Sequence, residues 1–521
     1  MTKRLSYLSL PLLLPLLFIA TILLYGRVQA GGADVCTSGP PTCTYGSIQD
    51  AATNGPENTP LLIEAGTYFE NVEITRSVIF QGKGPDSTII DGQLMDTAVL
   101  INGDPTISIS GLTIRNGDST LEGGGVLNEA GQVTLADVIV EENMAPFGAG
   151  ITNNDVMVLD DVIVRNNVAD EVVGFCEDCA GGGIYNLSVM TITNSIIHGN
   201  SAKFGGGIEN ASAGTFWATG IDVYSNSAED APDEASAGGG IENFGTVTLT
   251  NISVRNNDAP IGAGVSNGGT LTISGSDIYG NIADTRGGGI HNSFNLTVQT
   301  SNVYDNEAGS GGGGGISSES GDVMVVQTAV YSNSATGNGG GIVHNVDPVS
   351  GDNSFVITNS TLSGNSAIGT GGGIRNAGIA STELNNVTLN NNSSIVGAGQ
   401  SVSVAGGTLE FKNSIINSAG TDCSGSIGSN GYNIASDNSC GLGGTADLVS
   451  ANPQLGPLQN NGGSSLTHAL LLGSPAIDSG SGCPAVDQRG VARPAGAECD
   501  RGAYEFSEEN VTVYLPFVLR P

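Results

Sequence analysis

Basic residues are scarce in this 521-residue chain. Lysine and arginine together number 16, against 51 aspartates and glutamates, and the formal net charge is −35. Nucleic acids and anionic membranes are themselves polyanions and are repelled by such a surface. The composition therefore argues against both as partners.

Long apolar runs are absent after the first thirty residues. Lys3 and Arg4 precede an apolar run from about Leu8 to Leu24, and small residues follow up to Ala30. This order is typical of a secretory signal peptide cleaved after Ala30, and a retained membrane anchor is the alternative. No later stretch is long and apolar enough to span a bilayer as a helix. We therefore expect an exported protein, secreted or at the cell surface, with no membrane span in the mature chain.

Motifs for metal binding, phosphate binding and catalysis are also missing. No EF-hand loop or P-loop is present, so we expect no cofactor beyond loosely bound calcium between acidic loops. Basic residues are few between residues 121 and 415, and the acids there form no compact cluster, so we predict no catalytic residue. The four histidines show no metal-ligand spacing, and we expect surface or turn positions for them. They are His198, His291, His344 and His468.

The eight cysteines fall into four pairs that are close in the sequence. In an exported chain such pairs are expected to form local disulfides. The second pair is a single CxxC, for which a redox or metal site is the alternative. The expected pairs are Cys36/Cys43, Cys176/Cys179, Cys423/Cys440 and Cys483/Cys499.

One glycine phrase recurs through the middle of the chain, which has 80 glycines in all. In "KFGGGIEN", Lys203 to Asn210, three glycines precede an isoleucine. A phosphate loop would occur once and lead into a helix, whereas this phrase returns at intervals of 24 to 33 residues. A unit of about 25 residues with insertions is the period of a solenoid. The phrase or a close variant ends at Val126, Ile151, Ile184, Ile208, Ile241, Val265, Ile290, Ile316, Ile342, Ile374 and Gln400.

Asparagine recurs at two further positions of most repeats. The first lies two residues after the end of the glycine phrase, and the second lies 14 to 16 residues further on. Because glycine and asparagine both tolerate left-handed backbone, we expect them to mark corners. The first series is Asn128, Asn153, Asn186, Asn210, Asn243, Asn267, Asn292 and Asn376, and the second is Asn143, Asn167, Asn200, Asn226, Asn257, Asn281, Asn306, Asn333, Asn365 and Asn392.

Between these corners the sequence alternates apolar and polar residues. An example is "TVTLTNISVRNN", Thr246 to Asn257, which is rich in β-branched side chains. The pattern predicts three short strands per repeat with one face buried. We therefore predict an all-β fold, a right-handed parallel β-helix of about thirteen coils stacked roughly 4.8 Å apart. Three longer intervals predict inserted loops at 170–180, 229–237 and 345–353.

Two stretches resemble known β-helix families. From about Leu121 to Gln400 the glycine phrase resembles the GGA[I/L/V] phrase of polymorphic outer membrane protein repeats, although the FxxN phrase of that family does not occur. Upstream, "AGTYFENVEITRSVIFQGKGPDSTIIDG", Ala65 to Gly92, is similar to the first coils of pectate-lyase-like and pectin-methylesterase-like proteins. These resemblances imply the pectin-lyase-like fold, and a fold alone does not carry an activity.

A third stretch, Asn452 to Glu505, resembles the choice-of-anchor Q domain of bacterial surface proteins. The matching segments are PLQNNGG, THAL, GSPAID, DQRG and CDRGAYE. The resemblance implies an exported, surface-associated repeat protein. We expect a signal peptide at 1–30, an N-terminal cap at 31–60, the β-helix at 61–425, a small disulfide-stapled C-terminal capping or anchor domain at 426–506, and an acidic spacer with an apolar tail at 507–521. The tail is expected to be either a last strand of that domain or a sorting signal.

One row of strand residues is predicted to point outward. It lies two positions before each asparagine of the second series, next to an apolar residue that points inward. Stacked rings there suit a sugar or a partner protein, and the alternative is that like residues stack only to stabilise the coil. This outward stripe is Glu141, Arg165, His198, Tyr224, Arg255, Tyr279, Tyr304, Tyr331, Ser363 and Asn390. The candidate ligand-binding residues are Tyr224, Arg255, Tyr279, Tyr304 and Tyr331, with Asp222, Asp277 and Asn302 as flanking acceptors.

These features favour an exported, non-catalytic bacterial surface protein for adhesion, binding an extracellular glycan or a surface protein. A carbohydrate-active enzyme on the same fold, either a lyase or a hydrolase, is the second hypothesis. A spacer whose repeats bind nothing is the third.

Overall fold

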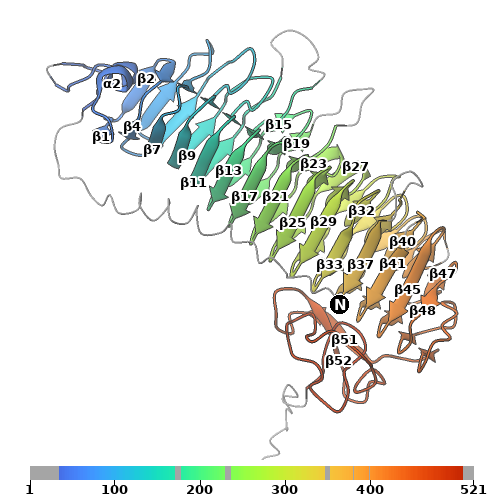
Figure 1. Cartoon of the computed structure of the whole chain (residues 1–521). Coiled ribbons are helices and arrows are strands. Elements are labelled where there is room, and N and C mark those ends of the chain that lie inside the picture. The colour runs from blue at the N-terminus through green and yellow to red at the C-terminus, as the bar shows by residue number, and fades with distance from the viewer. Residues whose placement is uncertain are drawn as a thin grey trace, which may run out of the picture.

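The chain forms a long parallel β-helix with a smaller unit attached near its C-terminal end (Figure 1). The computed structural model describes residues 34–40, 42–170, 178–228, 236–346, 353–379, 381–397 and 399–507. Fourteen strands stack in one sheet within this part of the chain, so the predicted fold and its repeat are confirmed.

Three parallel sheets run along the β-helix. In the largest, most repeats contribute a strand of four or five residues and a strand of three. Its strands are β1 (Pro60–Leu62), β2 (Gly66–Phe69), β4 (Val78–Gln81), β5 (Thr88–Asp91), β7 (Thr106–Arg115), β9 (Gln132–Glu141), β11 (Val156–Arg165), β13 (Val189–Thr193), β14 (Ile196–His198), β17 (Thr215–Thr219), β18 (Asp222–Tyr224), β21 (Thr246–Thr250), β22 (Ser253–Arg255), β25 (Thr270–Ser274), β26 (Asp277–Tyr279), β29 (Asn295–Gln299), β30 (Asn302–Tyr304), β33 (Val323–Val326), β34 (Ala329–Tyr331), β37 (Ser354–Thr358), β38 (Thr361–Ser363), β41 (Ser381–Asn385), β42 (Thr388–Asn390), β45 (Thr408–Lys412), β46 (Ile415–Asn417), β48 (Gly428–Ser429), β49 (Ile434–Ala435) and β50 (Leu448–Val449).

The two smaller sheets complete each coil. The second sheet follows the glycine phrase, and its strands are β3 (Val72–Ile74), β6 (Val99–Ile101), β8 (Val126–Asn128), β10 (Ile151–Asn153), β12 (Ile184–Asn186), β16 (Ile208–Asn210), β20 (Ile241–Asn243), β24 (Val265–Asn267), β28 (Ile290–Asn292), β32 (Ile316–Ser318), β36 (Ile342–His344), β40 (Ile374–Asn376), β44 (Val402–Val404) and β47 (Cys423–Ser424). The third sheet holds β15 (Ser201–Ala202), β19 (Ser227–Ala228), β23 (Asp258–Ile261), β27 (Ile282–Arg286), β31 (Glu307–Ala308), β35 (Ser334–Ala335), β39 (Ser366–Ala367) and β43 (Ser393–Ser394).

The glycine phrase forms the corner before the second sheet. Gly205 has a φ of 57°, a left-handed conformation that costs little only for glycine. A Cβ on Gly206 would lie 2.3 Å from the Ser227 carbonyl oxygen, and one on Gly207 would lie 2.5 Å from that of Gly240. The first glycine is therefore required by the turn, and the next two by the close approach of the next coil.

The asparagine series have a different role from the predicted one. Asn200 and its counterparts do not adopt left-handed backbone; the residue before them does, as at Gly199 (φ 66°) and Asn166 (φ 55°). Each amide of the second series donates through Nδ2 to Oδ1 of the next coil, at 2.9 to 3.1 Å, in an unbroken ladder from Asn143 to Asn392. Because these amides are buried, they need internal partners, and the stack supplies them. The asparagines thus stabilise the corner through their side chains.

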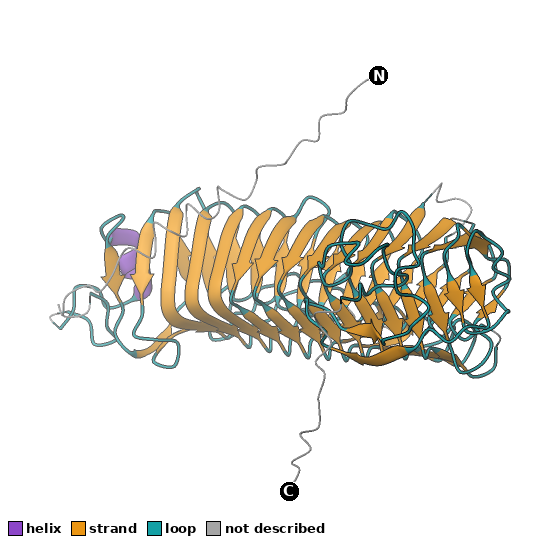
Figure 2. Cartoon of the chain, turned by 90° about the horizontal axis from the view of Figure 1, so that it is seen from below, coloured by secondary structure: helices purple, strands orange, loops and turns teal. Residues whose placement is uncertain are grey.

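The N-terminal end of the β-helix is covered by a helix, α2 (Ile48–Asn54), which is drawn in purple in Figure 2. Ile48, Ala51 and Ala52 enter the continuous core of the coils. The side chain of Ser47 accepts a hydrogen bond from the Asp50 amide and caps the helix. A cap was predicted here but no helix, because seven residues are too few for a helical period to show.

The parallel ladder continues beyond the predicted domain boundary at residue 426. Ile415 pairs with Ile434, and Ile434 pairs with Leu448. The C-terminal unit therefore begins close to Asn452, where the chain leaves the last coil and forms the antiparallel pair β51 (Leu455–Gln459) and β52 (Thr467–Leu470). It lies along the flank of the last coils rather than over their end (Figure 1). The late coils lack the glycine phrase, so no repeated motif marks them in the sequence.

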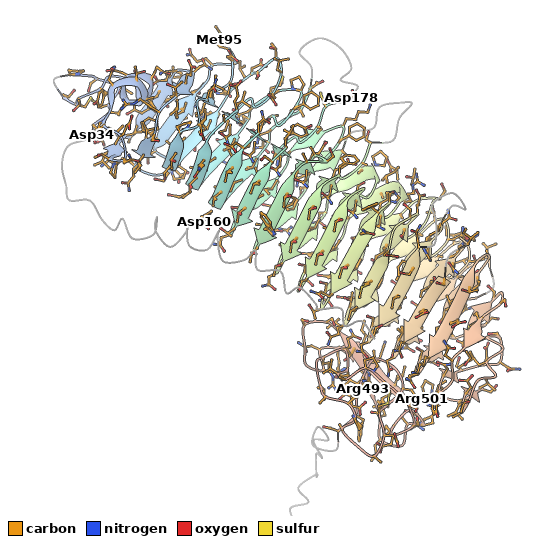
Figure 3. All side chains as sticks on the ribbon, viewed as in Figure 1. Asp34, Met95, Asp160, Asp178, Arg493 and Arg501 are labelled. Carbon is orange, nitrogen blue, oxygen red and sulfur yellow. A yellow bond between two sulfur atoms is a disulfide. The ribbon has the colours of Figure 1, made fainter. Side chains whose placement is uncertain are left out.

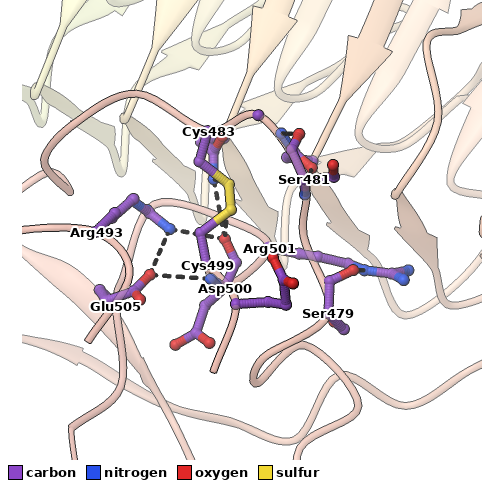
Figure 4. Close-up of a disulfide and its surroundings, with 12 residues drawn as sticks. Ser479, Ser481, Cys483, Arg493, Cys499, Asp500, Arg501 and Glu505 are labelled. Atoms are coloured by element: carbon purple, nitrogen blue, oxygen red, sulfur yellow. Dashed lines mark hydrogen bonds and ion pairs between the residues drawn. A yellow bond between two sulfur atoms is a disulfide. The ribbon is translucent and has the colours of Figure 1, made fainter. Parts of the chain in front are cut away.

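Three of the four predicted disulfides are present. Cys36 bonds to Cys43, Cys423 to Cys440 within the last coils, and Cys483 to Cys499 in the C-terminal unit (Figure 4). The predicted pair of Cys176 with Cys179 includes Cys176, which lies outside the described residues, as do most of the three predicted insertions. Disulfides are typical of an oxidising environment outside the cytosol. Within the described part of the chain, no helix is long and apolar enough to cross a membrane.

Candidate functional site

The outward stripe lies in register along the largest sheet. Each member pairs with the equivalent residue of the next coil, for example Tyr279 with Tyr304 and Tyr304 with Tyr331. The neighbouring Val303 and Val330 point into the core and are fully buried. Alternation along these strands therefore positions the stripe as the sequence predicts. From Glu141 to Tyr331 its side chains are partly exposed.

The aromatic side chains of the stripe stack on one another. Ring centroids are 4.8 Å apart between His198 and Tyr224, between Tyr279 and Tyr304, and between Tyr304 and Tyr331. The rings of each pair are parallel to within 5°. Parallel rings at this centroid distance form stacked aromatic pairs. The spacing of the rings equals the expected spacing of the coils, because each ring lies on the strand next to its partner's.

Arg255 interrupts the rings and is held by two neighbours. Its guanidinium lies 4.0 Å from the Tyr224 ring centroid, a cation–π contact. Its Nε and Nη2 donate to the two carboxylate oxygens of Asp222, at 3.1 and 2.6 Å. The hydrogen bonds that Arg255 donates to Asp222 raise the pKa of Arg255. Asp222 is therefore engaged by Arg255, so it is less available to a ligand than the sequence suggested.

The other predicted acceptors are also engaged within the stripe. Asp277 Oδ1 accepts a hydrogen bond from Asn302 Nδ2 at 2.9 Å. Asn302 in turn contacts the C-terminal unit, donating to the Ser464 carbonyl and accepting from the Leu466 amide. At the opposite end of the stripe, Arg165 pairs with Glu141 at 2.6 Å. The hydroxyl groups of the tyrosines are thus the groups best placed to meet a ligand.

Burial shifts the pKa values of two tyrosines and the histidine of the stripe. It raises the pKa of Tyr304 to about 12, with a further contribution from the charge of Asp277, and it also raises the pKa of Tyr331. Burial, followed by the charge of Arg165, lowers the pKa of His198. At neutral pH the stripe therefore presents phenol groups that can both donate and accept hydrogen bonds, and a neutral imidazole.

The stripe ends where the C-terminal unit covers it. His468, on β52, lies 2.9 Å from Ser363 Oγ and 3.2 Å from Asn390 Nδ2 through Nε2. Its Nδ1 lies 2.8 Å from the Gly456 carbonyl, so Nδ1 carries the proton and Nε2 accepts. Ser363 and Asn390 are buried. Small polar residues replace tyrosine in these coils because another part of the chain packs on them.

Further hydrogen bonds join the unit to the same face. Gln488 Oε1 accepts from Thr361 Oγ1 at 2.6 Å, and the Gln327 amide donates to the Asp487 carbonyl at 2.9 Å. The Asn386 amide donates to the carbonyls of Asp500 and Gly502. The DQRG and CDRGAYE segments therefore supply part of the contact surface with the β-helix.

The same two segments, together with Arg493 between them, form a buried ion network inside the unit. Arg493 pairs with Glu505 at 2.9 Å, and Arg489 pairs with Asp487 at 2.7 Å, all with side chains at most 3% exposed. Arg493 and Arg501 are labelled in Figure 3, and the surroundings of the Cys483–Cys499 disulfide are drawn in Figure 4. Removing one member would leave an unpaired buried charge, which is strongly destabilising. The motif residues act as structural parts of the unit.

A second row of outward residues was not predicted. It follows the central residues of β16, β20, β24 and β28, which are Glu209, Glu242, Ser266 and His291, all at most 7% exposed. The glycine corner covers this buried row, since a Cβ on Gly238 would lie 2.6 Å from that of Glu242. Glu209 and Glu242 each have one carboxylate oxygen without a hydrogen-bond partner. Burial raises the pKa of Glu209 to about 8, and it also raises the pKa of Glu242 well above its ordinary value.

Glu209 and Glu242 are two buried carboxyls that pair in register on adjacent coils, and they can be compared with an enzyme's acid and base. A glycosidase of the usual kind needs one protonated carboxyl and one ionised carboxyl. Here burial raises the pKa of both carboxyls, so it does not separate them into an acid and a base. Among the described residues no group of three or more histidines, cysteines, aspartates and glutamates could hold a metal ion.

The predicted positions of three histidines were wrong. His291, His344 and His468 are buried, and burial lowers the pKa of each. His344 Nδ1 lies 2.9 Å from Thr382 Oγ1, and His291 Nε2 lies 3.2 Å from Ser293 Oγ. His198 alone of the four is partly exposed, in the stripe. Each of these buried imidazoles lies next to a polar group, which makes it possible for histidine to occupy a buried position.

Comparisons with known proteins give only distant likenesses. No protein-family model and no curated protein matches the sequence. Among solved structures, the mannuronan C-5 epimerase A-module of Azotobacter vinelandii aligns with 74% of this chain and 93% of its own, at 15% identity and a TM-score of 0.32. A pectate lyase aligns with 87% and 90%, at 14% identity and a TM-score of 0.30. The catalytic domain of an α-1,3-glucanase in complex with nigerose aligns with 72% and 67%, at 13% identity and a TM-score of 0.29.

Identities and TM-scores this low support no conclusion about the activity of this chain. The fold rests on the parallel ladders themselves, and the resemblances to the choice-of-anchor Q domain and the polymorphic outer membrane protein repeats stay predictions.

Proposed function

We propose that this chain is an exported, non-catalytic bacterial surface protein that binds a glycan along the outward stripe. The observation that carries the proposal is the row from His198 to Tyr331, partly exposed and in register over six coils. Burial raises the pKa of Tyr304 and of Tyr331, so these two phenols stay protonated at neutral pH. A row of hydroxyl groups spaced about 5 Å apart offers repeated hydrogen bonds to a polymer that itself repeats.

The surrounding charge narrows the class of glycan. The chain carries a net charge of −35, and both arginines of the stripe are paired with acids. An acidic polysaccharide would be repelled and would find no unpaired cation in the stripe. The proposed ligand is therefore an uncharged or amino-sugar polymer. The C-terminal unit blocks one end of the stripe, so the polymer would lie over the coils before β38.

A glycan array probed with the mature protein tests the proposal. The comparison is with the triple variant Tyr279→Ala, Tyr304→Ala, Tyr331→Ala, and Tyr45→Ala near the N-terminal end serves as control. We expect the wild type and the control to bind the same polymer, and the triple variant to lose binding. Equal binding by the triple variant would remove the stripe from the proposal. Release of reducing or unsaturated sugar ends would show that the chain is a carbohydrate-active enzyme and not only a binding protein. Binding of a surface protein, with no binding of any glycan, would show that the ligand is a protein.

A further inference from the structure

A half-open hollow of about 860 Å³ lies on the C-terminal unit. This volume is in the range of pockets that hold a ligand of several residues. Its apolar lining includes Leu472, Ile477, Val491, Pro494 and Phe506. Among the described residues that line it, Asp478 carries the only charge.

The apolar lining is uncovered in the described part of the chain. Leu472 is 76% exposed, and its neighbour Leu471 is 48% exposed. Two adjacent leucines at the edge of a hollow form an apolar patch of the kind that marks a docking surface. Asp478 is exposed beside them, with Oδ1 accepting the Glu498 amide at 3.2 Å.

The chain itself continues from the edge of this hollow. Ser507 lines it and is the last described residue. The sequence that follows is acidic for two residues and then reads "VTVYLPFVLRP", residues 511–521, which is apolar apart from Thr512 and Arg520. The charge of Arg520 is opposite to that of Asp478.

We propose that residues 511–521 of this chain dock in the hollow, with their apolar side chains against Leu472, Ile477 and Phe506 and Arg520 beside Asp478. A tether of three residues gives the segment an effective concentration in the millimolar range at the hollow. A second copy of the chain, or a separate protein, would have to bind from solution and compete with this tethered segment. This inference does not depend on the proposed glycan binding.

Chymotrypsin cleavage of the full chain tests the docking. Tyr514 and Phe517 are cleavage sites within the segment, and mass spectrometry follows the loss of the C-terminal fragments. We expect slow cleavage in the wild type and cleavage at least tenfold faster in Leu472→Ser, whose exposed side chain is not needed for folding. Met95→Ser, 76% exposed at the far end of the β-helix, is the matched control and should leave the rate unchanged.

The proposed ion pair between Asp478 and Arg520 is tested by the substitutions Asp478→Asn and Arg520→Gln. Asp478 has a φ of 50°, which asparagine tolerates, and asparagine keeps the acceptor for the Glu498 amide. We expect either substitution to raise the cleavage rate several-fold, and both together to add little more, because they remove one interaction. Wild-type cleavage as fast as that of the isolated peptide 508–521 would overturn the proposal, as would rates that Leu472→Ser and Asp478→Asn leave unchanged. If protection from chymotrypsin increases with protein concentration, and light scattering shows a dimer, the hollow binds a second copy of the chain instead.

Discussion

Two rows of side chains point away from the core of this β-helix, and they differ in what lies over them. The outward stripe on β18, β22, β26, β30 and β34 is partly open to solvent and is rich in tyrosine. The buried row on β16, β20, β24 and β28 is covered by the glycine corner and contains two glutamates and a histidine. Strand alternation sets which way a residue points, but the neighbouring chain decides whether it meets water. Facing outward is therefore not evidence of exposure, and only the open row is a candidate for binding.

The largest expected effect comes from replacing the two buried glutamates with glutamine. Because the pKa of Glu209 is about 8 in the folded chain and near 4.5 when unfolded, the folded state keeps a proton that the unfolded state loses between these values. Stability therefore falls as the pH rises through this window, by an amount on the order of a few kcal/mol. We expect Glu209→Gln with Glu242→Gln to remove most of that fall, measured as Tm against pH from 5 to 9.

The matched control for this prediction is Glu383→Gln with Glu410→Gln. These two glutamates also pair in register on adjacent coils, but Glu383 is exposed and Glu410 partly so. Their replacement should leave the pH dependence of Tm unchanged. If both double variants flatten the curve equally, burial is not its cause.

The open row is expected to respond more weakly. Tyr304 stacks on two rings and Tyr331 on one. At about 1 kcal/mol for each stacked pair beyond burial, Tyr304→Ala should lose about twice as much stacking energy as Tyr331→Ala. Urea unfolding of both variants measures the difference in the free energy of unfolding. Equal losses would mean that the stack contributes little, and that the tyrosines are retained for another reason.

The smallest effect is expected at Arg255. Its pair with Asp222 is about a quarter exposed, so Arg255→Gln should cost about 1 kcal/mol or less, and the cost should shrink in high salt. Chemical unfolding at low and high salt provides the measurement. A loss that salt does not change would point to packing on Tyr224 as the main contribution of Arg255.

The sequence predicted the features that repeat and missed those that do not. The 25-residue period, the strand alternation and the register of the tyrosines follow from local pattern, and so do three local disulfides. His468 against Ser363 and Gln488 against Thr361 join residues more than a hundred positions apart, and no local pattern marks such contacts. Asparagine was correctly placed at the corners, but its buried amide ladder depends on the neighbouring coil, which a single repeat does not show.

The central claim is that the hydroxyl groups of the open row bind a glycan, and its most direct test is a tyrosine-to-phenylalanine comparison. The triple variant Tyr279→Phe, Tyr304→Phe, Tyr331→Phe keeps the stacked rings and removes only the hydroxyls. Isothermal titration of wild type and variant with the polymer found on the array measures the two affinities. The account predicts at least tenfold weaker binding by the phenylalanine variant, with an unchanged Tm. Equal affinity of the two proteins would contradict it.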